Sequence, residues 1–417
     1  AAPLYAQGLP AGNAAALGFS PARLARIDTV MQHYLDSGQV AGVVVLVARH
    51  GQVAYFRAFG ASDREAGRRM TNDALFRIAS QTKAITSVAA MMLVEEGKLS
   101  LHDPVSRWIP SFAHTTVALA TDSGRTPVPA KREITIHDLL THTSGISYGT
   151  DARVAERYRA AGLGPAAGWG WYTADKDEPI CTTMDRLGTL PFVAQPGTAF
   201  VYGYSLDVLG CIIERASGMP LDKYFSTRLF KPLRMTNTWF FPPADQARRL
   251  ATVYASTDTG LERAPDGARG QGAYLAGPRR SFAGGAGLVS SASDYARFLQ
   301  MMLNGGTLDG ARVLSPSTVS LMTTGHVDAL YGQSESEDGT GRGFGLGFDV
   351  VKSRGLADAF ASVGTFSWGG AYGTNYWADP EQGIVGIYMM QLLPRRTDLG
   401  DRFQALVYQA ITAPVRR

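Results

Sequence analysis

An almost wholly apolar run near the beginning of the chain constrains its fold more than any other feature. Residues 42–48 contain no charged or polar side chain, a pattern typical of a strand that is buried on both faces. The turn His50-Gly51-Gln52 leads into residues 53–60, which have the pattern of a second strand and complete a hairpin. Such a hairpin is stable only within a larger sheet that other elements cover.

Elements of the same kind return at the other end of the chain. The candidate strands there are residues 344–351, 373–378 and 384–390, and the candidate helices, one near each end of the chain, are residues 20–38 and 398–411. We therefore predict an α+β fold in which a single antiparallel sheet is assembled from both chain ends and is flanked by helices from both ends.

The middle of the chain has a different character, because helical periodicity dominates there. We predict a sheet domain made of residues 1–79 and 282–417, and an inserted, mostly helical domain made of residues 80–281. The sequence shows no internal repeat, and no linker is long enough to separate the two domains.

Composition and charge exclude several classes of protein. The 417 residues carry 40 basic and 36 acidic side chains, and the resulting net charge of +4 is too small to predict nucleic acid or an anionic membrane as a partner. No apolar run approaches the roughly 18 residues of a membrane-spanning helix, so no membrane insertion is predicted. The seven histidines form no metal-binding motif, and two cysteines are too few for a Cys-ligated zinc site. We expect no metal and no other cofactor.

The two cysteines and the first residues bear on the compartment. Cys181 and Cys211 could form a disulfide in an exported protein, but we predict two separate, partly buried thiols. The chain begins with Ala1 and not with Met, which fits a processed export signal or a trimmed chain. We favour a periplasmic or secreted location over the cytoplasm. The sequence gives no prediction of the oligomeric state.

Ser80 and Lys83 stand at the start of an apolar helix, in the string Ser80-Gln81-Thr82-Lys83. Side chains three residues apart on a helix lie on one face, so the two can touch. A serine hydroxyl becomes a nucleophile when a neighbouring base removes its proton, and a buried lysine can be that base because desolvation disfavours its charged form. The helix N-terminus also favours a developing oxyanion. The alternative is an N-cap serine beside a solvated lysine.

A second serine, Ser147, lies in residues 145–149, a string that matches the G-x-S-x-G pattern of α/β-hydrolases. In those enzymes the serine stands on a turn between a buried strand and a helix. Here residues 135–143 have the pattern of a capped helix, and only His326 follows as a possible histidine partner. We therefore predict that Ser147 is a loop residue and not a nucleophile.

Two further stretches could complete a site around Ser80. Tyr202 lies just before a predicted helix, where a tyrosine can present its hydroxyl to a cleft and relay protons, although an isolated tyrosine is more often a packing residue. Residues 368–371, Trp-Gly-Gly-Ala, precede a predicted strand. Paired glycines allow the backbone to approach a substrate and to aim an N–H group at it. The alternative for this stretch is an ordinary turn or a strand bulge.

Together these stretches resemble the serine β-lactamase and penicillin-binding-protein superfamily, in which they occur in the same order. The similarity covers nearly the whole chain and includes Phe76-Arg77-Ile78-Ala79, Leu139-Leu140-Thr141-His142-Thr143-Ser144-Gly145 and Gly284-Gly285-Ala286-Gly287-Leu288. The chain looks most like the family VIII carboxylesterases, which share the class C β-lactamase fold. The resemblance implies a β-lactamase/transpeptidase-like fold with the active site between its two domains.

The same resemblance implies a role for each matching residue. Ser80 would be the nucleophile, Lys83 its activating base, and Tyr202 the residue that relays protons. Tyr204 is the fallback for Tyr202, because the two tyrosines are only two positions apart. The backbone N–H groups of Ser80 and Ala371 would form the oxyanion hole.

Two departures from the β-lactamase pattern bear on the substrate. Where β-lactamases have Lys-Thr-Gly, this chain has Trp368-Gly369-Gly370, so no lysine is present to bind the carboxylate of a β-lactam. Where they have the Asn of Tyr-x-Asn, this chain has Tyr204. We predict that Trp368, Gly369, Gly370 and Tyr204 contact the substrate, and that neutral esters are favoured because they need neither of the missing groups.

The sequence therefore predicts a serine carboxylesterase that cleaves small-molecule esters, with short-to-medium acyl or alcohol groups, through an acyl-enzyme on Ser80. Three aromatic residues in a Gly-rich stretch, Trp169, Trp171 and Tyr172, either line the cleft or anchor a long loop. The alternatives on the same scaffold are a β-lactamase, a D-amino-acid peptidase and an acyltransferase. A non-catalytic penicillin-recognition module is the alternative from a different class.

Overall fold

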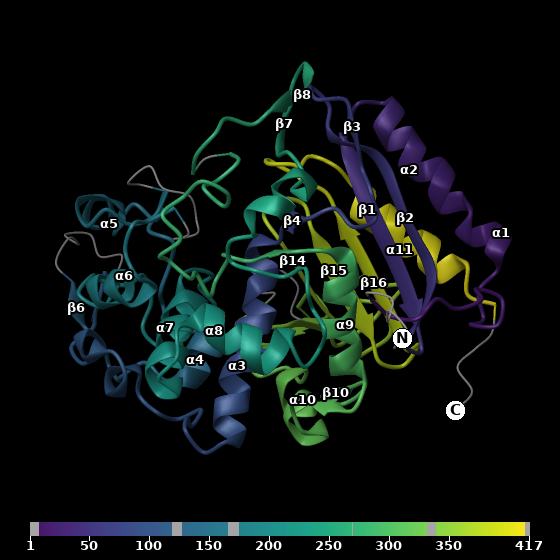
Figure 1. Ribbon diagram of the computed structural model, residues 1–417. Helices are drawn as coiled ribbons and strands as arrows, with labels where there is room; N and C mark the ends of the chain where they lie inside the picture. Colours follow the sequence, from purple (N-terminus) through teal and green to yellow (C-terminus); the bar gives the residue numbers. More distant parts are fainter. Residues whose placement is uncertain (1–7, 119–126, 166–174, 269, 332–338, 413–417) are drawn as a thin grey trace, which may run out of the picture.

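An eight-stranded antiparallel sheet lies at the centre of the computed structural model, which describes residues 8–118, 127–165, 175–268, 270–331 and 339–412 (Figure 1). Its strand order is β12-β13-β14-β15-β16-β1-β2-β3. The strands are β1 (Gly42–Arg49), β2 (Gln52–Asp63), β3 (Arg68–Arg69), β12 (Arg342–Phe344), β13 (Asp349–Val351), β14 (Phe366–Gly369), β15 (Asn375–Asp379) and β16 (Ile384–Met389). Because β1 pairs with both β2 and β16, the two chain ends meet in the middle of the sheet, and the predicted fold class is confirmed.

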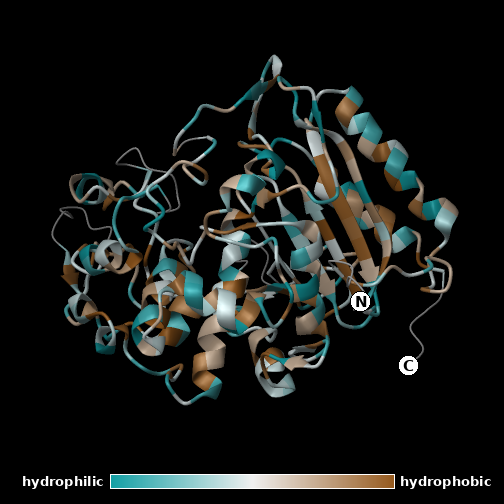
Figure 2. Ribbon diagram, viewed as in Figure 1, coloured by the Kyte–Doolittle hydropathy of each residue, from teal (hydrophilic) through white to brown (hydrophobic). Residues whose placement is uncertain are grey.

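Every residue of β1 is buried, as its apolar sequence predicts. Its side chains alternate between two hydrophobic clusters, one on each face of the sheet. Three helices cover the face to which Val43, Val45 and Val47 point: α1 (Pro21–Leu24), α2 (Arg26–Asp36) and α11 (Leu399–Gln409). The helix α9 (Ala292–Leu303) crosses the opposite face. Figure 2 shows β1 brown along its length, whereas α2 carries brown and teal residues on different sides.

The stretch 344–351 differs from its prediction as one continuous strand. It contains the end of β12, a turn and β13, which pair with each other as a hairpin. The break falls at Gly347, which adopts a φ of 92° and so reverses the chain at no steric cost. The apolar pattern alone predicts one strand here, but the turn at this glycine divides it into two short strands.

The helical part of the chain lies beside the sheet and is organised around α3 and α7 (Figure 1). Its helices are α3 (Thr82–Glu95), α4 (Ile136–Leu140), α5 (Ala155–Ala160), α6 (Ile180–Leu187), α7 (Ser205–Ser217) and α8 (Leu221–Phe225), and α10 (Pro316–Met322) follows α9. All residues of α3 from Thr82 to Leu93 are buried, which is typical of a helix enclosed on every side. The domain boundaries at residues 79/80 and 281/282 stay a prediction.

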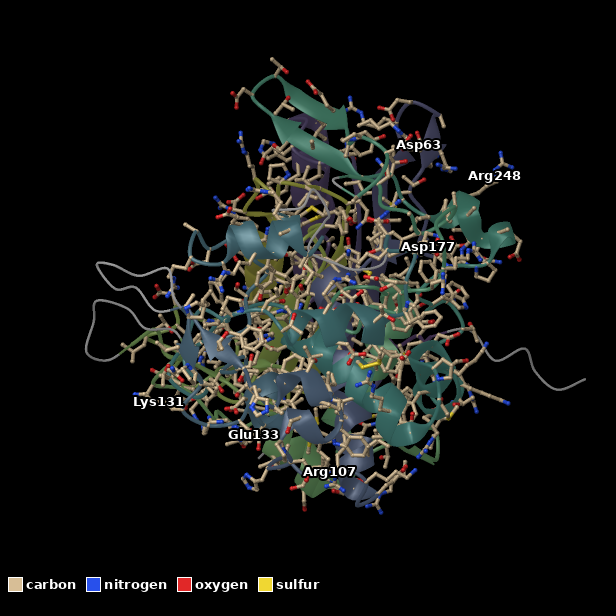
Figure 3. All side chains as sticks on the ribbon, turned by 90° about the vertical axis from the view of Figure 1, so that its left-hand side faces the viewer. Asp63, Arg107, Lys131, Glu133, Asp177 and Arg248 are labelled. Carbon is tan, nitrogen blue, oxygen red and sulfur yellow. A yellow bond between two sulfur atoms is a disulfide. The ribbon has the colours of Figure 1, made fainter. Side chains whose placement is uncertain are left out.

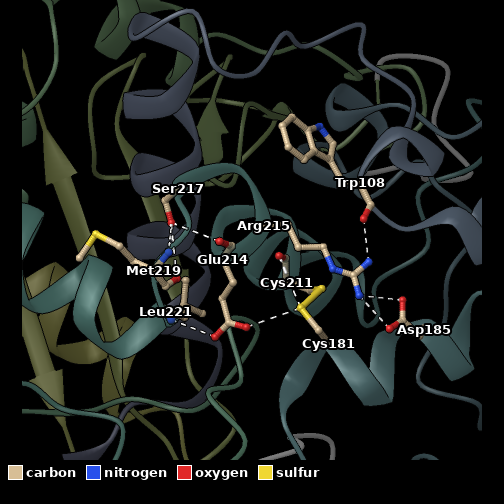
Figure 4. The surroundings of a disulfide bond; sticks show 9 residues. All are labelled: Trp108, Cys181, Asp185, Cys211, Glu214, Arg215, Ser217, Met219 and Leu221. Carbon is tan, nitrogen blue, oxygen red and sulfur yellow. Dashed lines mark hydrogen bonds and ion pairs between the residues drawn. A yellow bond between two sulfur atoms is a disulfide. The ribbon is translucent and has the colours of Figure 1, made fainter.

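The two cysteines form a disulfide that ties α6 to α7, so the prediction of two separate thiols is wrong (Figure 4). The two helices pack side by side, which brings the Cα atoms of Cys181 and Cys211 to 5.0 Å, inside the range that a disulfide spans. The packing of α6 on α7 decides this pairing, and the spacing of 30 residues in the sequence does not reveal it.

Removing this disulfide should destabilise the protein without removing its activity. Closing a loop of this length lowers the entropy of the unfolded chain by an amount worth about 3–4 kcal/mol. For a chain of this size the double variant Cys181→Ser/Cys211→Ser should therefore lose roughly 4 °C in Tm. Calorimetry of the wild type with and without reductant, beside the double variant, checks this. An equal Tm in all three samples contradicts it.

The surface carries charges of both signs. In Figure 3, basic and acidic side chains are interspersed on the face shown, with Lys131 near Glu133 at one end and Arg248, Asp63 and Asp177 at the other. Among the described helices, none combines the length and apolar character needed to cross a bilayer.

Candidate active site

Ser80 lies in a tight turn between the short strand β4 (Phe76–Arg77) and α3. β4 pairs with β9 (Val289–Ser290), and the 3-10 turn η1 (Ala79–Gln81) carries the chain from β4 into α3. Within this turn Ala79 has a φ of 43°, in the left-handed region that residues with a side chain rarely adopt. Strained turns of this kind cluster at active sites. Ser80 remains partly exposed, whereas Ala79 and Gln81 on either side of it are buried.

Lys83 lies next to Ser80 on the same face of α3 and is almost completely enclosed, with 1% of its surface exposed. Its Nζ donates to Ser80 Oγ at 3.2 Å, to the hydroxyl of Tyr148 at 2.9 Å and to the carbonyl oxygen of Gly285 at 2.8 Å. An ammonium has three N–H groups, and these three acceptors match them. The structure thus brings together the serine and the lysine that the sequence singles out.

Tyr148 is the site residue that sequence reasoning missed. It lies in the loop after α4, where its hydroxyl accepts from Lys83 and is also hydrogen-bonded to Ser80. Burial raises the pKa of the Tyr148 phenol well above its usual value, with further contributions from Tyr202 and Asp207, so the hydroxyl stays protonated at neutral pH. The only signal in the sequence is its position three residues after Gly145, in a stretch that drew attention for Ser147.

Ser147 itself faces away from this arrangement. Its hydroxyl is buried and accepts from the backbone N–H of Gly149 at 3.1 Å, two residues further along the same loop. Tyr158 of α5 is its other neighbour. Ser147 therefore acts within its own loop, as its sequence context suggests.

Tyr202 lies on the other side of Lys83. The centroid of its ring is 4.6 Å from Lys83 Nζ, and its hydroxyl oxygen accepts from Trp368 Nε1 at 3.1 Å. Both Tyr202 and Trp368 are partly exposed. Because the indole N–H occupies the phenol oxygen as a donor, the O–H of Tyr202 can point to a substrate.

Tyr204 has a different environment. Only 1% of its surface is exposed, and its ring packs edge-on against that of Tyr148 with 4.9 Å between the centroids. Burial raises the pKa of Tyr204 well above its usual value. A side chain in this position supports the ring of Tyr148 and does not line an open cleft, although the sequence analysis placed it among the substrate contacts.

An aromatic wall stands behind Tyr202 and Trp368. His142 packs on Tyr202 with 4.6 Å between ring centroids, and Phe344 packs on both His142 and Trp368. Burial, and next to it the charge of Lys83, hold the pKa of His142 well below its usual value, so this imidazole is neutral. The wall is therefore apolar in effect.

The stretch 368–371 lies directly against the turn that holds Ser80. β14 ends at Gly369 and contacts η1, and Gly370 approaches the chain so closely that a Cβ there would lie 2.3 Å from the carbonyl oxygen of Ile78. Only glycine fits at this point. Ala371 is the next residue after this close approach, and its role as a second oxyanion donor stays a prediction.

Two other expectations concern groups outside this arrangement. Trp169, Trp171 and Tyr172 lie outside the described residues. Within the described ranges, no group of three or more His, Cys, Asp or Glu residues could hold a metal ion.

Known proteins resemble this chain over most of its length. Residues 27–410 match the family model described as Beta-lactamase. Protein Rv1367c of Mycobacterium tuberculosis is 39% identical over 377 residues and Esterase EstB of Burkholderia gladioli is 35% identical over 373 residues, each alignment covering 86% of this chain and 88% of the relative. The solved structure of EstCE1, described as a hydrolase with promiscuous acyltransferase activity, has a TM-score of 0.76 and 30% identity and covers 94% of this chain and 99% of its own.

A sheet built from both chain ends, beside a helical part whose enclosed helix begins with a Ser-x-x-Lys pair, defines the class of β-lactamase-like proteins. The chain belongs to the β-lactamase family. Within that superfamily, the predicted resemblance to the family VIII carboxylesterases is confirmed by the similarity to EstB and EstCE1.

Proposed function

We propose that this protein hydrolyses carboxylic esters through an acyl-enzyme formed on Ser80. Its class, serine carboxylesterase, follows from the family and from the relatives EstB and EstCE1. The acyl-enzyme, the roles of single residues and the substrates are the proposal. The observation that carries it is the contact of one buried amine, Lys83 Nζ, with both Ser80 Oγ and the Tyr148 hydroxyl.

In the acylation step, Ser80 Oγ attacks the ester carbonyl while Lys83 in its neutral form accepts the hydroxyl proton. The Tyr148 hydroxyl, which accepts from Lys83 and is hydrogen-bonded to Ser80, keeps the two aligned. The N–H groups of Ser80 and Ala371 receive the negative charge on the carbonyl oxygen. A tetrahedral intermediate results, with a new bond between Ser80 Oγ and the carbonyl carbon.

The collapse of this intermediate needs a proton for the leaving alcohol. Tyr202 gives this proton, and Trp368 Nε1, which donates to the phenol oxygen, stabilises the negative charge that develops there. The proton that Lys83 received then returns to Tyr202. Water attacks the acyl-enzyme in the reverse order, releasing the acid and restoring Ser80.

The surroundings of the site favour neutral esters. Trp368-Gly369-Gly370 brings an indole and a backbone edge to the place where β-lactamases hold a lysine. The ring of Trp368 continues into the wall formed by Phe344 and His142. Phe344 and His142 are buried behind Trp368, so an apolar acyl group would pack on the exposed part of the indole. A carboxylate there finds no cationic partner from the stretch 368–370.

A comparison of two substrates tests this function. We expect kcat/KM for p-nitrophenyl butyrate to exceed that for a chromogenic cephalosporin by at least about 100-fold, because the β-lactam loses two polar contacts worth on the order of 1–3 kcal/mol each. Both rates are measured on the same preparation. Comparable or faster cephalosporin turnover would instead support a β-lactamase.

Two further outcomes distinguish the other candidate functions. An increase in ester product when an alcohol is added to the assay would support acyl transfer, an activity that the description of EstCE1 assigns to that protein. Labelling of the protein by a penicillin without turnover of any ester would support a penicillin-recognition module.

A further inference from the structure

A pair of glycines passes between α3 and α7 directly behind Lys83. Thr86 of α3 donates its hydroxyl to the carbonyl oxygen of Gly284 at 2.6 Å, and Lys83 donates to that of Gly285 at 2.8 Å. From the other side, Asp207 of α7 accepts the backbone N–H of Gly285 at 3.2 Å. A Cβ on Gly285 would lie 2.2 Å from Asp207 Oδ2, so any larger residue there would displace that carboxylate. Gly285 is therefore held by hydrogen bonds between Lys83 and Asp207.

Asp207 is completely buried, and only one of its carboxylate oxygens has a partner. Oδ1 accepts from Gly285, whereas Oδ2 accepts no hydrogen bond from the described residues. Burial raises the pKa of Asp207 to about 6, against the positive charge of Lys83, which lowers it. Above that pH the folded protein thus keeps a carboxylate in an environment that disfavours it.

Among the described residues, the cation that acts on the charge of Asp207 is Lys83. All three hydrogen-bond acceptors of Lys83 are neutral. The titratable groups that interact with Asp207 are Lys83 of α3, Tyr148 of the loop after α4 and Tyr204 at the start of α7. An asparagine could accept the Gly285 N–H equally well, so holding Gly285 does not by itself account for a carboxylate.

We propose that Asp207 is a positioning residue for Lys83: its carboxylate fixes Gly285, aims the carbonyl of that glycine at Nζ and supplies the negative charge that balances the ammonium. This inference rests on the proposed function of Ser80 and Lys83. Asp207 acts through Gly285 and through its field, without touching the substrate.

The variant Asp207→Asn separates the charge from the hydrogen bond, since it keeps the acceptor for Gly285. The variant removes the negative charge beside Gly285, so the acidic limb of the pH dependence of kcat/KM should move to lower pH by about one unit. The plateau should fall about tenfold, because no carboxylate then balances the positive charge that forms when Lys83 accepts the Ser80 proton. Both are measured with p-nitrophenyl butyrate, whose neutral ester does not titrate.

Asp294 provides a matched control. It is a buried aspartate on α9 that accepts from Asn237 N and Thr238 Oγ1, leaves Oδ1 without a partner among the described residues, and has a pKa raised by burial to about 6. Asp294→Asn removes a similar buried charge away from Lys83 and should leave the pH profile in place. If the acidic limb of Asp207→Asn lies at the same pH as that of the wild type, the inference is overturned, whatever the height of the plateau.

Two further measurements keep the outcome clear. If Asp207→Asn does not fold, Gly285→Ala replaces it, because the added Cβ pushes the carboxylate away; an unshifted acidic limb in the folded variant then overturns the inference. Activity of Ser80→Ala decides the proposed function separately. If Ser80→Ala is inactive and the Asp207→Asn profile is unshifted, the proposed function stands and only the role of Asp207 falls.

Discussion

Replacement of Ser80 by alanine is expected to lower kcat/KM for p-nitrophenyl butyrate by about 10⁴-fold or more. The variant loses the atom that forms the acyl-enzyme, and the oxyanion donors and Lys83 cannot replace a missing nucleophile. Lys83 keeps two of its three acceptors, Tyr148 and Gly285, so the fold around it should persist. Steady-state kinetics of the purified variant check this, with circular dichroism to establish that it is folded.

Ser147→Ala is the matched control for this variant. It removes the same hydroxyl from the other serine that a sequence motif nominates, and it costs only local contacts with Gly149 and Tyr158. We expect it to retain most of the wild-type activity. Mass spectrometry of rapidly quenched protein should also show a butyryl adduct on Ser80. An inactive Ser147→Ala beside an active Ser80→Ala reverses the assignment of the nucleophile.

Periodicity and turn residues predict one antiparallel sheet assembled from both chain ends, but they predict neither the short strand β3 nor β14. The apolar strand β1 and the hairpin of β15 and β16 have sequences that fit only a buried sheet, and their pairing across the chain ends follows because each needs a partner. The break between β12 and β13 was not predictable in the same way, because it depends on the conformation of a single glycine, Gly347. The disulfide between α6 and α7 likewise depends on how two helices pack.

The candidate site likewise contains local contacts that the sequence predicts and long-range contacts that it does not. Ser80 and Lys83 are three residues apart on one helix, so their contact follows from helix geometry alone. The contact of Lys83 with Tyr148 spans 65 positions, and that with Gly285 spans 202, so neither can be inferred from spacing. Local sequence could not rank Tyr148, Tyr202 and Tyr204, because burial and hydroxyl direction distinguish them and both arise from tertiary packing.

Tyr148 and Tyr202 are expected to respond differently to the leaving group. Tyr148→Phe removes the hydroxyl between Lys83 and Ser80, which serves attack on any ester, so kcat/KM should fall about 100-fold for p-nitrophenyl butyrate and for ethyl butyrate alike. Tyr202→Phe removes the proton donor for the leaving alcohol. p-Nitrophenolate leaves without that proton and ethoxide does not, so the loss should be about tenfold for the aryl ester and about 10³-fold for the ethyl ester.

The contrast between these substrates is informative because kcat/KM reports acylation, the step in which the alcohol leaves. Tyr204→Phe supplies the control: it deletes a phenol hydroxyl from a buried ring that packs on Tyr148, and it should change either rate by less than about threefold. If the leaving-group dependence appears in Tyr148→Phe and not in Tyr202→Phe, the two tyrosines exchange roles. Full activity of Tyr148→Phe on both esters means that its hydrogen bond to Lys83 only holds the loop in place, and Tyr202 is then the one phenol that takes part in the chemistry.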